Sequence, residues 1–141
     1  MAKEEITPGE WQIMEVLWAC GKPLTSSEVC KRMQRNVDMS MRMVRVLMNR
    51  LSQKNVPGYT VDEHDARVYH YYVQRTREEC VREKSRKFVD RYFSGNGSNA
   101  MAALLHSFVL TDEQIRELEE ILEQSRERKA ESTKREGGSH A

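Results

Sequence analysis

Residues 40–54 constrain the fold of this chain more than any other stretch of the sequence. When they are placed on a helix at about 100° per residue, the apolar side chains fall within one third of the circle. The opposite side carries arginine and amide side chains, so one face is predicted to be buried and the other exposed. The predicted buried residues are Val44, Leu47, Met48 and Leu51, and the predicted outward residues are Arg42, Arg45, Asn49 and Gln53.

A capping box, in which a threonine is followed three positions later by glutamate or glutamine, marks three helix starts. The side chains of such a pair satisfy free N–H groups in the first turn of a helix. Before residue 40, helices are predicted over about 8–20 and 26–35, and a short turn joins the second helix to the third. The three pairs are Thr7 with Glu10, Thr25 with Glu28, and Thr111 with Gln114.

A tyrosine-rich β-hairpin is predicted after the third helix. Pro57 and Gly58 interrupt the helical pattern, and residues 59–63 and 67–73 then alternate as two strands, with Arg67 at the tip. The strand alternation predicts two faces. One face is predicted to carry Tyr69, Tyr71 and Val73, and the other Val68, His70 and Tyr72.

Three helices followed by a hairpin is the element order of a winged helix-turn-helix. The second and third helices, joined by a short turn, would form the DNA-reading unit. The predicted fold class is therefore mainly α with a small β-hairpin. Residues 1–75 are assigned to this winged-helix DNA-binding domain.

Residues 76–129 are predicted to form a helical dimerisation region. They indicate helices over about 77–93, 100–109 and 112–128, with a linker over 94–98. The apolar stripes of the first and last helices have no large core to enter, and soluble monomers seldom leave such surface exposed. Pairing with a second copy about a two-fold axis covers the stripes and implies a palindromic operator. The predicted dimerisation residues are Phe88, Tyr92, Ile115, Leu118, Ile121 and Leu122.

The formal net charge of +1 conceals a division of charge along the chain. Residues 31–54 hold seven lysines or arginines and one aspartate, which is typical of a surface that meets an anionic partner. Residues 112–123 hold six acidic side chains and one arginine. Residues 130–141 lack apolar anchors and are predicted to be a disordered tail.

Four segments, taken in order, resemble those of one known family. Residues 7–18 are similar to the opening helix of the penicillinase repressor family, and residues 44–54 are similar to its recognition helix. Residues 67–71 resemble its wing strand, and residues 117–122 resemble its last dimerisation helix. The resemblance covers about residues 6–123, which is most of the chain.

The resemblance implies a dimeric transcriptional repressor that occupies a palindromic operator, in an antibiotic- or stress-response operon. In one branch of the family, a membrane sensor protease relays a β-lactam signal, and the repressor is cut at an Asn-Phe bond ahead of the last helix. In another branch, a cysteine cluster near the C-terminus reads copper.

The sequence departs from the family pattern at three places. No cysteine follows Cys80, which argues against the copper mode of sensing. Residues 104–108 correspond to the cleavage region and contain no Asn-Phe pair, which argues against cleavage there. Met43 and Val46 stand on the recognition helix where the family usually has threonine, so a different operator sequence is expected.

The outward face of the third helix offers side chains suited to reading base pairs. Arginine can bond guanine through two hydrogen bonds, asparagine can do the same for adenine, and a valine can contact the methyl group of thymine. Basic side chains at the helix end and the hairpin tip suit phosphate, which positions a protein without specifying sequence. The predicted base-reading residues are Arg42, Arg45, Val46 and Asn49, and the predicted phosphate contacts are Arg50, Lys54 and Arg67.

Two alternatives to a DNA-binding repressor stay open at this point. The first is a metal- or redox-responsive regulator on the same scaffold that uses Cys20, Cys30 or Cys80, although their spacing matches no metal motif. The second is a winged-helix adaptor that binds protein and not DNA. No catalytic motif is present, so we expect no enzyme activity, no cofactor and no metal site. The sequence has no apolar run long enough for a membrane helix, and a cytoplasmic protein is expected.

Overall fold

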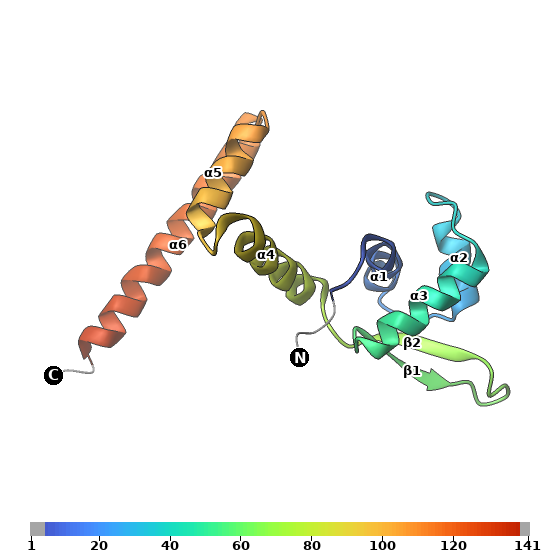
Figure 1. The fold of residues 1–141 in the computed structure, drawn as a ribbon. Coiled ribbons are helices and arrows are strands. Elements are labelled where there is room, and N and C mark those ends of the chain that lie inside the picture. The colour runs from blue at the N-terminus through green and yellow to red at the C-terminus, as the bar shows by residue number, and fades with distance from the viewer. Residues whose placement is uncertain (1–4, 139–141) are drawn as a thin grey trace. The chain divides into compact units, whose positions relative to one another are not determined.

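The computed structural model describes residues 5–138 and divides into two compact units, Met1–Gly95 and Asn96–Ala141 (Figure 1). Within residues 5–138, the first unit contains three helices, a two-stranded hairpin and a fourth helix, and the second contains two helices. The elements are α1 (Pro8–Cys20), α2 (Ser26–Met33), α3 (Met41–Gln53), β1 (Pro57–Val61), β2 (Tyr69–Val73), α4 (Arg77–Phe93), α5 (Gly97–Ser107) and α6 (Asp112–Gly138). The predicted mainly α fold with a winged helix-turn-helix is confirmed.

The core of the first unit lies between α1, α2 and α3. Both capping boxes predicted here are present, because the Thr7 and Thr25 hydroxyls accept from the amides of Glu10 and Glu28. The apolar face predicted for residues 40–54 is buried as expected. Val44, Met48 and Leu51 are fully buried beside Ile13 and Met14 of α1 and Val29 of α2.

The hairpin packs against this core as the wing. Its strands are antiparallel and pair Tyr59 with Tyr71, and Leu24 forms a bridge to the far side of Tyr71. The register places Tyr69, Tyr71 and Val73 on one face, as the alternation predicted. On the other face the ring of Tyr72 lies over Gly58, where an added Cβ would fall 2.5 Å from Tyr72 Cζ.

The helix α4 packs on the winged helix along its first half. Cys80 belongs to the buried core, and the Trp18 indole donates to the backbone carbonyl of Arg75, 3.0 Å away. The Arg77 guanidinium also pairs with Glu15 of α1. The compact unit that contains the winged helix extends to Gly95 and so includes α4, whereas the boundary expected at residue 75 between a DNA-binding and a dimerisation region stays a prediction.

The second unit consists of α5 and α6. The capping box at Thr111 and Gln114 is present, with both bonds formed. The helix α6 continues to Gly138, so the prediction of disorder from residue 130 is wrong for 130–138, and residues 139–141 lie outside the described part. The stretch after 128 contains alanine, glutamate, lysine and arginine, which favour a helix even without apolar anchors.

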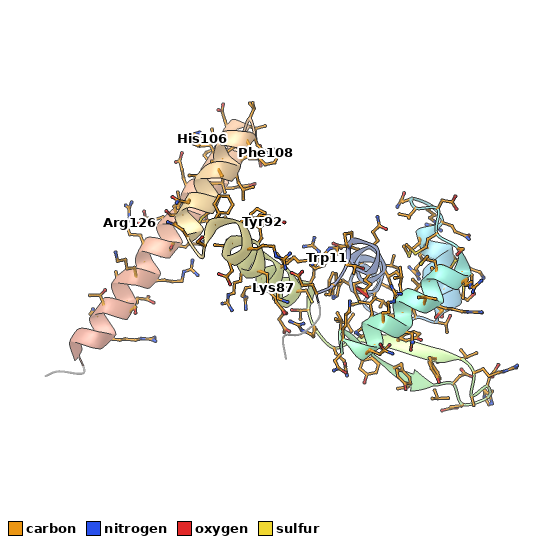
Figure 2. The ribbon with its side chains drawn as sticks, in the orientation of Figure 1. Trp11, Lys87, Tyr92, His106, Phe108 and Arg126 are labelled. Atoms are coloured by element: carbon orange, nitrogen blue, oxygen red, sulfur yellow. The ribbon has the colours of Figure 1, made fainter. Side chains whose placement is uncertain are left out.

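Large apolar side chains remain exposed on α4, α5 and α6. Figure 2 shows Tyr92 on α4 and Phe108 after α5, which are 66% and 64% exposed. Phe88, Ile115, Ile121 and Leu122, all predicted dimerisation residues, are also exposed, and Leu118 is half-buried. Within the single chain as described, these stripes therefore have no core of their own.

A buried ion pair ties the start of α1 to the end of α3. The Glu10 side chain is fully buried and that of Lys54 is 10% exposed, and the Lys54 ammonium lies 2.5 Å from Glu10 Oε1. Burial alone would raise the pKa of Glu10. Hydrogen bonds from Lys54 and from the Thr7 amide outweigh this and hold the pKa below its usual range.

We expect acid to weaken this contact and to lower the free energy of unfolding. Because the pKa of Glu10 is lower in the folded state, its ionised form contributes stability above the unfolded pKa of about 4.3, and loses it as pH falls through the folded value. Urea unfolding of the wild type and of Glu10→Gln from pH 7 to pH 3 tests this. The stability difference between the two proteins should shrink as pH falls, and a constant difference would contradict the assignment.

Candidate nucleic-acid interface

The outward face of α3 carries basic and amide side chains that form no ion pair or side-chain hydrogen bond with the other residues that the structure describes. Arg42, Arg45 and Asn49 are exposed, as predicted, and so is Val46 at 40%. Across residues 5–138, the guanidinium groups of Arg42, Arg45 and Arg50 enter no ion pair. They can therefore bind an external anion without breaking an internal contact.

The tip of the wing is ordered by a carboxylate and presents Arg67 to solvent. Asp62 accepts hydrogen bonds from the amides of His64 and Asp65, and His70 Nε2 lies 2.8 Å from Asp62 Oδ1. The hydrogen bond with His70, followed by the two amides, lowers the pKa of Asp62. The Arg67 side chain is 91% exposed, and its only ion pair among the described residues is with Asp65 at 3.2 Å.

An open groove of about 780 Å³ runs between α3 and the wing. It brings together Arg45 and Asn49 of α3 with Arg67 of the wing tip, three predicted site residues from two parts of the sequence. Arg42, Val46 and Arg50 lie on α3 outside this lining. The groove is lined by Thr25, Ser26, Ser27, Met41, Arg45, Asn49, Asp65, Arg67, Val68, Tyr69 and Tyr71.

The start of α2 also contributes to this groove, which was not predicted from the sequence. Ser26 and Ser27 form the first turn of α2, where backbone N–H groups are unpaired and favour anions. Ser26 also hydrogen-bonds the hydroxyl of Tyr71, whose pKa is raised mainly by burial. The signal was present as three consecutive hydroxyl residues at the predicted start of the second helix.

Lys54 is the predicted site residue that the structure places elsewhere. Its ammonium donates to the Glu10 carboxylate and to the Glu5 carbonyl at 2.8 Å, so its charge is already used inside the fold. A largely buried, paired ammonium cannot reach a phosphate without breaking these bonds. The position of the Lys54 ammonium therefore does not support a contact with phosphate. The sequence pattern placed Lys54 at the end of the third helix and gave no indication of its partner.

The cysteines form no common site. Cys30 and Cys80 are buried in the core, and Cys20 is half-buried near the end of α1. Burial raises the pKa of the Cys80 thiol, which lowers its reactivity. In the part of the chain that the structure describes, no group of three or more histidine, cysteine, aspartate or glutamate side chains is arranged to hold a metal ion.

None of the helices described between residues 5 and 138 combines the length and apolar character needed to span a bilayer.

Comparison with known proteins gives consistent matches along nearly the whole chain. A family model described as the penicillinase repressor matches residues 6–124. The penicillinase repressor of Bacillus licheniformis is 25% identical over 127 residues, which is 90% of this chain and 96% of that protein. The penicillinase repressor of Staphylococcus aureus is 23% identical over 119 residues, 84% of this chain and 90% of that protein. Among solved structures, an S. aureus MepR–DNA complex is 20% identical and covers 72% of this chain and 77% of that one, with a TM-score of 0.42.

Proposed function

The chain belongs to the penicillinase repressor family, and we propose that it represses transcription by binding operator DNA sequence-specifically through its winged helix. The observation that carries the proposal is the groove between α3 and the wing, where Arg45, Asn49 and Arg67 come together. The family consists of transcription regulators, so the prediction that the chain is not an enzyme is confirmed.

Each exposed residue of the interface has a proposed role. Arg42, Arg45 and Asn49 are suited to the hydrogen-bonding edges of bases in the major groove, and Val46 is suited to a thymine methyl group. Arg50 is proposed to contact phosphate beside α3. Arg67 is proposed to contact phosphate from the wing tip, where it is almost fully exposed. Ser26 and Ser27 join this set as phosphate contacts at the start of α2.

We propose that the repressor acts as a homodimer on a palindromic operator of an antibiotic- or stress-response operon. The exposed apolar residues of α4 and α6 support this, because a second copy would remove them from water. A two-fold dimer presents two copies of α3, and these match two half-sites of opposite orientation.

A sensor protease is a further proposed partner, taken from the family resemblance. Phe108 and Val109 lie between α5 and α6 and are 64% and 100% exposed, so the backbone there is accessible to a protease. The Asn-Phe bond cut in the β-lactam branch is absent from this stretch. Cleavage would therefore use a different peptide bond.

Salt dependence distinguishes a DNA-binding repressor from an adaptor that binds protein. If the dimer neutralises about 6–10 phosphates, its affinity for DNA falls roughly 10³- to 10⁵-fold between 50 and 200 mM salt. Fluorescence anisotropy with a duplex from the promoter of its own gene measures this slope. Affinity that is weak and independent of salt would contradict the proposal and favour the adaptor.

A further inference from the structure

The segment from Glu5 to Thr7 lies between the end of α3 and the face of α4. Its main chain is held from both sides. The Lys54 ammonium at the end of α3 donates to the carbonyl of Glu5 at 2.8 Å, and the Lys84 ammonium of α4 donates to the carbonyl of Ile6 at 2.6 Å. Two lysines 30 residues apart in the sequence, one at the end of α3 and one on α4, therefore hold neighbouring carbonyl groups of this segment.

The side chain of Glu5 extends this contact toward the end of α4. Its carboxylate accepts from the guanidinium of Arg91 at 3.1 Å. That hydrogen bond is also the main reason that the pKa of Glu5 lies below its ordinary value. The side chains of Glu5 and Arg91 are 33% and 58% exposed, so this outer pair can be altered without opening the core.

The contacts on α4 lie along one face of the helix. Cys80, Lys84 and Arg91 are spaced by four and then seven residues, about one and then about two turns, which places them on the same side of the helix. Cys80 is in the core, Lys84 holds Ile6, and Arg91 holds Glu5. These residues span most of α4, which is about 25 Å long.

The adjacent face of α4 carries the exposed aromatic rings. Phe88 and Tyr92 are 41% and 66% exposed, and their ring centroids lie 5.4 Å apart. They are proposed dimerisation residues, and Tyr92 directly follows Arg91. One helix therefore carries the proposed dimer contact and the attachment to the winged helix on neighbouring faces.

We propose that Glu5 and Arg91 are positioning residues that fix α4 on the winged helix and so set the separation of the two α3 helices in the dimer. Without the pair, the contact between Glu5 and the last turns of α4 is lost, while the contacts of Cys80 and Lys84 nearer the start of the helix remain. Its far end, beside the dimer contact, then moves relative to α3. The inference rests on the proposed homodimer and names the residues that control its spacing.

A rigid connection matters because two half-sites are read together. Once one winged helix is bound, the effective concentration of the second depends on how closely its position matches the other half-site. A variant that loosens α4 should bind the paired site about tenfold more weakly, and a single half-site as well as before.

The test compares the wild type with Glu5→Gln and with the charge exchange Glu5→Arg/Arg91→Glu. Arg86→Ala is the matched control, since Arg86 is an exposed arginine of α4 for which the described residues provide no ion pair.

A nitroxide on the native thiol of Cys20, the least buried cysteine, reports the distance between the two winged helices by pulsed dipolar EPR. Mass spectrometry confirms one label per chain.

We expect a narrow distance distribution for the wild type and for Arg86→Ala, a broader one for Glu5→Gln, and a return toward wild type in the charge exchange. The paired site is the duplex that the wild type protects on the promoter of its own gene. Titration with this duplex gives the affinity for the paired site, and titration with one half of it scrambled gives the affinity for a single half-site. The inference would be overturned if all four proteins had distance distributions of equal width and the same ratio of paired-site to half-site affinity. That outcome would not contradict the proposed function. Absence of any dipolar signal in the wild type would instead refute the homodimer, and this inference with it.

Discussion

Lys54→Met is expected to lower the free energy of unfolding by about 3–5 kcal/mol, because it leaves the fully buried Glu10 carboxylate without its counter-charge. Methionine keeps most of the side-chain volume of lysine. The loss of stability would therefore result from the missing charge and not from a cavity. Urea unfolding followed by circular dichroism measures the change. A loss of this size is a large fraction of the stability of a typical domain.

Two controls separate the buried pair from other effects of removing a lysine. Lys31→Met removes an exposed lysine of α2 and should change stability little. The double variant Glu10→Gln/Lys54→Met removes both charges while a glutamine can still complete the capping box, so it should be more stable than Lys54→Met alone. A Lys54→Met protein as stable as the wild type, but with weaker DNA binding, would restore Lys54 to the phosphate contacts.

The second large effect is expected from Ile121→Glu/Leu122→Glu, which should prevent dimerisation. These side chains are 54% and 62% exposed in the single chain, so the substitution costs little in the monomer. In a dimer it would bury four new charges in an apolar contact. Loss of the second winged helix should then lower the affinity for a paired site roughly 10²- to 10⁴-fold.

Sedimentation equilibrium and anisotropy on the same samples measure both parts of this prediction. Glu127→Gln is the control, because it changes an exposed residue of α6 outside the apolar stripe. A variant that still sediments as a dimer would show that α6 does not contribute to the contact. A wild type that sediments as a monomer would refute the homodimer itself.

Local patterns made most of the winged helix predictable. Both faces of α3 follow from a 3.6-residue period, and the strand faces of the wing follow from a period of two, because each pattern repeats within one element. Capping boxes located the starts of α1 and α2 for the same reason, since both partners lie within four residues.

Contacts between distant residues were not predictable in this way. Glu10 was interpreted only as a capping residue, although it shares a helical face with Ile13, Met14 and Leu17, and its partner Lys54 lies 44 residues away. The attachment of α4 to the winged helix depends on similar long-range contacts, which no local sequence pattern indicated. The prediction of disorder from residue 130 had another cause. The lack of apolar residues there argues against packing in a core, but it does not argue against a helix.

Arg45→Ala tests whether α3 reads the bases of the operator. Anisotropy titrations would use a duplex from the promoter of its own gene and a scrambled duplex of the same composition, with Arg82→Ala of α4 as the control for removing an exposed arginine. The wild type and Arg82→Ala should prefer the promoter duplex. Arg45→Ala should lose about 1–3 kcal/mol of binding free energy per half-site on that duplex, and little on the scrambled one. A wild type that binds both duplexes equally, with Arg45→Ala unchanged, would contradict the account.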